Sequence, residues 1–365
     1  MRKIFILGGS DLQLDLILEA KKMFFYTIVL DMNEECIGAK WCDEFLPINI
    51  ADKELVLEKA KEYKIDVILT SATELGNLTA CYVGEKLGLN TNSYQTALNT
   101  TNKTLMKKIF KKYEINTAKY QVIKKDEDIL WNIFPCIVKP SDSSAGRGLS
   151  YCKSQDKLNN AIQKALSYAC NDTIIVEEYI DGEQYSIEGI STNGMHQIVA
   201  IDKEEIHPLP HIMEIRHTIP APLQSHIQKS FQELTPKILD AFEIVYGASH
   251  IELRVREDEI FVVEIASRTG GMRSEMINLA YGVSYSQLLL LSALDLLKSV
   301  KPSREENVSC NFLIDYQAYV DYQELKKNKN YSVFEPFKLP KVPTDFVAEH
   351  IGKSMGYYFI LEGVE

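Results

Sequence analysis

Apolar runs alternate with amphipathic segments through the first hundred residues. Strand-like runs cover Lys3–Leu7, Tyr26–Leu30 and Ile65–Leu69. Helical periodicity covers Asp11–Met23, Asp52–Tyr63 and Leu75–Leu87. Strands that alternate with helices are typical of a parallel sheet with helices on its faces. The pattern therefore predicts a parallel α/β unit at the start of the chain.

The pattern changes twice after this unit. A basic helical segment at Asn99–Tyr113 precedes two strand-like runs, Cys136–Lys139 and Ile174–Glu178, which enclose a helix. These runs predict a small α+β unit. From Tyr185 strands dominate, and the chain ends in short strand-like runs with several prolines. We therefore expect four parts, with boundaries near 1–100, 101–184, 185–300 and 301–365.

Composition narrows the class of protein. At 365 residues the chain is long enough for two or three domains. The net charge of −11 argues against a nucleic-acid surface, because contact with phosphate backbones needs a basic face. The seven cysteines form no CxxC pair, and no apolar run is long enough for a membrane span or a signal peptide. We therefore expect a cytoplasmic protein with reduced thiols, and neither nucleic acid nor membrane as a partner.

A phosphate site is indicated where an apolar strand meets a glycine-rich loop. Lys139 stands at the end of the strand-like run, and the loop Ser141–Gly148 follows. Backbone N–H groups of such a loop can surround phosphate oxygens, while Lys139 and Arg147 supply positive charge. The Walker pattern GxxxxGKS/T is absent, so this is not a P-loop. A strand end followed by an ordinary surface turn remains the alternative.

The hairpin His250–Ala266 indicates a metal site. If its loop has three residues, Glu257–Glu259, then Glu252 lies opposite Glu264 on one face of the ladder. Two such carboxylates repel each other unless a cation lies between them, and hard oxygen ligands suit Mg²⁺. A two-residue loop would break this register. A solvated outer face is the alternative interpretation.

Other polar residues are weaker signals. Arg268, followed by Gly270 and Gly271, could clamp a carboxylate or a developing phosphate. His217 has no metal-ligand spacing to another histidine, so a zinc site is not expected. The turn Gly8–Ser10 lacks the GxGxxG fingerprint, which favours a structural or substrate-facing turn over an NAD site.

Taken in this order, the motifs resemble those of the ATP-grasp ligases. The resemblance covers most of the chain up to Leu297 and rests on Asn102–Lys103, Val138–Pro140 with the glycine loop, Val176–Ile180 with Gly182, the Glu252 strand, and Glu264–Arg268 with Gly270–Gly271. It implies an α/β and α+β fold. A Rossmann-like preATP-grasp domain would be followed by an ATP-grasp lid, an antiparallel-sheet catalytic subdomain and a small C-terminal subdomain.

The resemblance also implies roles for individual residues. ATP would contact Lys103, Lys139, Ser144, Gly146, Gly148, Glu177, Glu178, Ile180 and Gln184. Glu252 and Glu264 would hold Mg²⁺ or Mn²⁺. Arg268 and Lys139 would be catalytic, and the substrates would contact His217, Arg268, Gly270 and Gly271.

Two positions depart from the family pattern. Gln184 stands where the family often has a Glu that reaches the ribose, and Ala266 stands where an Asn often ligates metal. The implied activity is that of a carboxylate–amine ligase such as an L-amino acid ligase, which forms an acylphosphate and then an amide from small-molecule substrates. Dimers are common among such ligases. The alternatives are a bicarbonate-using or purine-pathway enzyme of the same fold, a non-catalytic nucleotide-binding regulator and, more remotely, a dehydrogenase.

Overall fold

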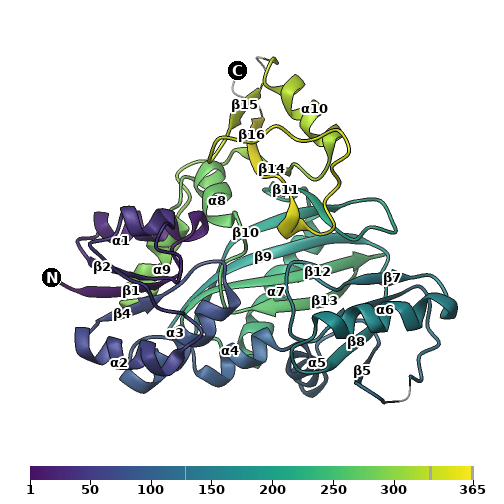
Figure 1. The fold of residues 1–365 in the computed structure, drawn as a ribbon, viewed down its shortest axis with the longest axis horizontal. Helices are drawn as coiled ribbons and strands as arrows, with labels where there is room; N and C mark the ends of the chain where they lie inside the picture. Colours follow the sequence, from purple (N-terminus) through teal and green to yellow (C-terminus); the bar gives the residue numbers. More distant parts are fainter. Residues whose placement is uncertain (128, 329–330, 363–365) are drawn as a thin grey trace.

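Three β-sheets organise the computed structural model, which describes residues 1–127, 129–328 and 331–362 (Figure 1). The first sheet is parallel, with the strand order β3-β2-β1-β4. Its strands are β1 (Lys3–Leu7), β2 (Tyr26–Leu30), β3 (Glu44–Leu46) and β4 (Val67–Leu69). The surrounding helices are α1 (Asp11–Lys22), the 3₁₀ helix η1 (Ile37–Lys40), α2 (Lys53–Tyr63) and α3 (Glu74–Leu87). This arrangement confirms the expected parallel α/β fold.

Burial explains why this sheet forms. The consecutive β1 residues Ile4 to Leu7 are all fully buried, as expected for a parallel strand that is covered on both faces. The turn after β1 is held by a contact within the first sheet unit. The Asp31 carboxylate accepts a hydrogen bond from Gly9 N at 2.8 Å. A Cβ atom on Gly9 would lie only 2.4 Å from Cys36 Sγ. These contacts favour the structural interpretation of the Gly8–Ser10 turn.

The second sheet, antiparallel with the order β5-β8-β6-β7, forms the lid. Its elements are β5 (Tyr120–Lys124), β6 (Cys136–Pro140), β7 (Ser150–Cys152), α6 (Gln155–Tyr168) and β8 (Thr173–Glu178). Two helices, α4 (Tyr94–Thr101) and α5 (Lys103–Lys112), lead into it. They are separate because Asn102 caps α5, its Oδ1 accepting from Thr104 N and Leu105 N at 2.9 and 3.1 Å. The cap fixes where Lys103 enters the structure.

The third sheet has eight antiparallel strands in the order β13-β12-β9-β10-β11-β14-β16-β15. They are β9 (Glu183–Thr192), β10 (Met195–Ile206), β11 (Glu214–Ile219), β12 (Gly247–Arg256), β13 (Glu259–Ala266), β14 (Asn307–Phe312), β15 (Tyr331–Phe334) and β16 (Tyr357–Glu362). The remaining helices are α7 (Ser225–Ala241), α8 (Arg273–Tyr281), α9 (Tyr285–Ala293), α10 (Tyr316–Leu325) and the 3₁₀ helix η2 (Ile351–Lys353). The C-terminal strands therefore extend the large sheet.

The large sheet joins the other two units. In Figure 1 the parallel unit, in purple and blue, lies at one end of this sheet, and the teal lid lies at the other. One apolar cluster, including Phe231, Phe242 and Ile251, packs α7 and α5 against β9, β12 and β13. Among the described residues, no helix combines the length and apolar character needed to cross a bilayer.

Candidate active site

A cavity between the lid and the large sheet brings together many of the predicted site residues. Its walls include Lys103, Lys139, Ser144, Gly146, Glu177, Glu178, Ile180, Gln184, Glu252 and Glu264. These residues come from α5, β6, the glycine-rich loop, β8, the β8–β9 connection, β9 and the β12–β13 hairpin. Gly148, His217, Arg268, Gly270 and Gly271 lie outside these walls.

On the lid side, Glu177 is held between two lysines. Its carboxylate forms an ion pair with Lys139 and another with Lys107, the latter at 2.9 Å. Burial would raise the pKa of Glu177, but the charges of Lys107 and Lys139 outweigh it and lower this pKa to about 2. Three ionised groups therefore meet at the cavity wall, and an anionic ligand can compete for the two cations.

Across the cavity, Lys103 reaches the second predicted metal residue. Lys103 Nζ lies 3.0 Å from Glu264 Oε2 and also donates to Ser143 O at 3.0 Å. Burial would raise the pKa of Glu264, but Lys103 and Lys139 outweigh this effect and lower it to about 2. Lys103 thus connects the β12–β13 hairpin to the glycine-rich loop. With Lys107, Lys139, Glu177 and Glu264 it forms a group that we call the cavity cluster.

The hairpin has the predicted Glu252–Glu264 pairing but not the predicted loop. Arg256 pairs with Glu259, so the turn has only two residues, Glu257 and Asp258. Their φ values of 49° and 68° are those that a tight hairpin turn requires. The three-residue loop was therefore wrong.

A β-bulge restores the pairing. Leu253 pairs with Val262 and Glu252 with Glu264, so Val263 is the extra residue on β13. Because of the bulge, the side chain of Val262 packs in the apolar core, and Val263 is not part of that cluster. Its effect is to leave both carboxylates facing the cavity.

The two carboxylates suit a hard divalent cation. Glu252 and Glu264 are adjacent on one face, and Glu264 stays ionised because of its lysine neighbours. A metal there would meet oxygen donors from both strands. Ala266, two residues beyond Glu264 on β13, offers no donor, so the protein supplies fewer oxygen ligands than the family pattern does.

The glycine-rich loop needs its glycines for conformation and space. Gly146 and Gly148 have φ values of 69° and 75°, which L-residues rarely adopt. A Cβ atom on Gly148 would also lie 2.9 Å from Pro140 Cγ. Gly148 therefore shapes the loop, while Ser144 and Gly146 line the cavity. Arg147 donates to Ser144 O at 3.2 Å and remains exposed.

Arg254 organises the segment predicted to receive the base. Its guanidinium donates to Ile180 O at 2.9 Å and to Gln184 Oε1 at 2.8 Å, and it lies over the Tyr179 ring. Gln184 in turn donates to Glu204 Oε2 at 2.6 Å. A glutamate at position 184 could not make that last bond in its ionised form. The Gln184 amide therefore suits Glu204, whereas Arg254 could donate equally to a glutamate at this position.

Arg268 is turned toward the first domain. Its Nε and a terminal nitrogen lie 2.8 and 2.6 Å from Glu74 Oε1, and it also donates to Thr269 O. The same turn is fixed by two more bonds from the first domain, from Ala72 N to Thr269 Oγ1 and from Asn77 Nδ2 to Ser267 Oγ. The predicted catalytic arginine is thus positioned by contacts between domains.

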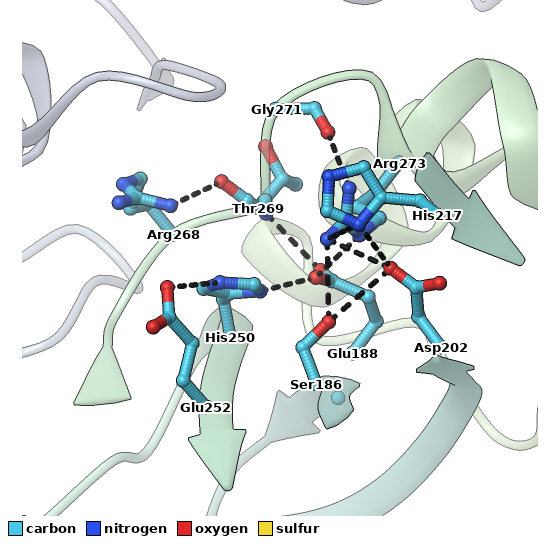
Figure 2. Close-up of polar contacts among 12 residues, drawn as sticks. Ser186, Glu188, Asp202, His217, His250, Glu252, Arg268, Thr269, Gly271 and Arg273 are labelled. Carbon is cyan, nitrogen blue, oxygen red and sulfur yellow. Dashed lines mark hydrogen bonds and ion pairs between the residues drawn. The ribbon is translucent and has the colours of Figure 1, made fainter. Parts of the chain in front are cut away.

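His217 lies in a group of buried charges that do not line the cavity, most of which Figure 2 labels. We call this group the interior cluster; its members are Glu188, Asp202, Glu204, His217 and Arg273, each at most 3% exposed. Burial and Arg273 would lower the pKa of His217, but Asp202 and Glu214 raise it to about 9. His217 Nδ1 lies 3.1 Å from Asp202 and Nε2 lies 3.2 Å from Glu214.

The interior cluster does not require a metal. Asp202, Glu204 and His217 are close enough to ligate one ion. However, Arg273 places a terminal nitrogen 2.8 Å from Asp202 and 2.9 Å from Glu204. This guanidinium supplies the positive charge that an ion would otherwise bring.

The sequence reasoning missed Lys107, Arg254 and Glu188. A signal existed for Lys107, because it follows Lys103 by four residues and so shares one face of α5. Arg254 similarly follows Glu252 by two residues on β12. Glu188 gave no local signal, since its partners are more than 60 residues away in the chain.

Comparisons with known proteins agree with this geometry. Residues 132–276 match the family model of the ATP-grasp domain. The formate-dependent phosphoribosylglycinamide formyltransferase of Wolinella succinogenes is 24% identical over 277 residues, covering 73% of this chain and 70% of that protein. The L-arginine-specific L-amino acid ligase of Bacillus subtilis is 28% identical over 245 residues, covering 64% of this chain and 58% of that one.

A solved structure extends the likeness to the whole fold. The N5-carboxyaminoimidazole synthetase from Staphylococcus aureus, complexed with ADP, aligns with a TM-score of 0.81 over 99% of this chain and 93% of its own. At 17% identity, this likeness concerns the fold alone. The resemblance inferred from the motifs is thus confirmed: residues 132–276 match the model of the ATP-grasp domain.

Proposed function

We propose that the protein is an ATP-dependent ligase that activates a small carboxylate as an acylphosphate and joins it to an amine. The observation that carries the proposal is the convergence of Lys103, Lys139, Glu252 and Glu264 on one cavity that is also lined by the glycine-rich loop. Cations and carboxylates in this arrangement suit a nucleoside triphosphate bound together with a divalent metal ion.

The proposed chemistry has two steps. A carboxylate oxygen of the first substrate attacks the γ-phosphorus, the bond to the β-phosphate breaks, and ADP leaves. The amine then attacks the acyl carbon, phosphate leaves, and the new amide nitrogen loses a proton. Lys103 and Lys139 neutralise phosphate charge, while Arg268 stabilises the acylphosphate or the tetrahedral species that follows.

Mg²⁺ or Mn²⁺ would be held by Glu252 and Glu264, and when bound it neutralises phosphate charge and orients the γ-phosphoryl group. Residues of the chain would also position the base of ATP and the substrates. Arg254 fixes the backbone of the base-binding segment through Ile180. The lid and the large sheet form the two sides of the cavity and would hold the substrates between them.

A one-carbon acid is the second candidate for the activated substrate. It is favoured by the longer match to a formate-dependent enzyme than to an amino acid ligase, 277 against 245 residues. Formate or bicarbonate would then replace the amino acid carboxylate in the first step. The amine acceptor would complete the reaction in either case.

The test is Mg-ATP turnover, measured as ADP and phosphate release. The panel contains single amino acids, amino acid pairs, other small acids, formate and bicarbonate, each with and without an amine. Release that needs one carboxylate and one amine supports the proposal, and the identity of the acid separates the two candidates. ATP binding without release for any panel member would contradict both and favour a nucleotide-binding regulator.

A substitution tests the metal assignment. Glu264→Gln should reduce turnover by at least ~100-fold in protein that still unfolds cooperatively, although loss of the ion pair with Lys103 should lower the unfolding temperature. Glu259→Gln is the matched control, since Glu259 lies on the same strand but is exposed. Equal rates for the two variants would refute the assignment of Glu264 to the metal.

A further inference from the structure

A buried carboxylate–histidine pair stands directly behind one predicted metal residue. His250 Nδ1 lies 2.5 Å from Glu188 Oε1, and His250 Nε2 lies 3.4 Å from Glu252 Oε1 (Figure 2). Glu188 is fully buried, and His250 is 6% exposed. Neither residue is part of the cavity wall, whereas Glu252 is. The pair therefore contacts the site from behind, through Glu252.

Glu188 also holds the turn that carries Arg268. Its Oε2 accepts a hydrogen bond from Gly270 N at 3.1 Å. A Cβ atom on Gly270 would lie 2.5 Å from Glu188 Oε1 and 2.9 Å from His250 Nδ1, so only glycine leaves room for the pair. One buried carboxylate thus fixes both the metal hairpin and the Arg268 turn.

The strand register places the pair beside the missing metal ligand. His250 is the direct cross-strand partner of Ala266, the position at which the family pattern has an Asn. Cross-strand partners share one face of the sheet and have adjacent Cβ atoms. Along the same strand, β12, His250 is a hydrogen-bonding neighbour of Glu252.

We propose that Glu188 and His250 are positioning residues that hold the Glu252 carboxylate for the divalent cation, in a protein whose position 266 offers no ligand. This inference rests on the proposed metal–nucleotide site. Partners of metal-binding carboxylates commonly set metal affinity without touching the metal, and their removal costs ~10–100-fold in affinity or activity.

The test compares His250→Asn with His250→Gln. By its length, the Asn side chain can keep a bond to Glu188 but does not reach Glu252, whereas Gln can extend to Glu252. The matched control is His196→Asn, because His196 lies in the same sheet between Ser191 and Asp240, at 2.8 and 3.1 Å, away from the cavity.

The first measurement is Mn²⁺ affinity in the presence of a non-hydrolysable ATP analogue, read from the EPR signal of free Mn²⁺. We expect His250→Asn to weaken Mn²⁺ binding ~10-fold, His250→Gln to recover part of the loss, and His196→Asn to match the wild type. In turnover, the KM for Mg²⁺ should rise while the KM for ATP at saturating Mg²⁺ stays constant, a split that a general loss of structure would not produce.

Each outcome has a distinct meaning. Wild-type protein that binds no Mn²⁺ with nucleotide would contradict the proposed function itself. Wild-type binding with an unchanged affinity in His250→Asn would overturn only the positioning role. Nitrogen couplings on bound Mn²⁺ that disappear in His250→Asn would also overturn it, because they would make His250 a direct ligand.

Discussion

The cavity cluster and the interior cluster contain similar residues but differ in what surrounds them. In the cavity cluster, Lys103 and Lys139 pair with Glu264 and Glu177 along the wall of an open cavity. In the interior cluster, Arg273 is surrounded by carboxylates from neighbouring strands, and none of its members lines that cavity. Both clusters are built from ion pairs, but only the members of the cavity cluster line this cavity.

This difference determines what each cluster can do. A phosphate that enters the cavity can form ion pairs with the lysines in place of Glu177 and Glu264. Water or a metal ion can then stabilise the negative charge of these two carboxylates. The interior cluster has no such replacement, so its charges must remain paired for the sheet and α8 to stay together. Buried charge alone therefore does not identify a functional site; access to a ligand does.

The largest expected effect concerns the interior cluster. Arg273→Met should lower the free energy of unfolding by about 3–5 kcal/mol, because it leaves buried carboxylates without a cation. Arg216 precedes His217 on β11 and is exposed. Arg216→Met should lower the free energy of unfolding by less than about 1 kcal/mol, since the ion pair of Arg216 with Glu205 is partly exposed. Urea unfolding measures both values. Similar losses of unfolding free energy in the two variants would contradict the claim that burial makes the charges of the interior cluster essential for stability.

A smaller effect is expected from pH at Glu177. Its folded pKa of about 2 lies below the ordinary value of 4.5, so its contribution to stability is present above that value and is lost as pH falls toward about 2. Glu177→Gln should therefore be less stable than the wild type at about pH 6, and the gap should narrow between about pH 4.5 and 2. Urea titrations across this range measure the gap. A gap independent of pH would show that the charge of Glu177 is not responsible.

The hairpin shows how far the sequence could predict this site. The pairing of Glu252 with Glu264 was correct, although the loop was one residue too long. The error was cancelled by the bulge at Val263. Residue alternation constrained which side chains share a face, but a bulge depends on tertiary packing, here including the bond from Val262 N to Asn116 O at 2.8 Å.

Long-range pairing was beyond the reach of the sequence. The parallel unit followed from local periodicity, and the antiparallel catalytic sheet from the resemblance to ATP-grasp ligases. Nothing local indicated that Arg268 would meet Glu74, 194 positions away, or that His250 would meet Glu188, 62 positions away. Such contacts depend on how the units dock, which local sequence patterns do not encode.

The smallest expected effect returns to the cavity cluster and concerns Lys139. Lys139→Ala should raise the KM for ATP by ~10-fold, equivalent to about 1.4 kcal/mol of binding. The free energy of unfolding should change less than in Arg273→Met, because Lys107 still pairs with Glu177 at 2.9 Å. Lys157→Ala, an exposed lysine of the same lid, is the control for both measurements. A large loss of stability with an unchanged KM would place Lys139 with the structural charges and remove the distinction between the two clusters.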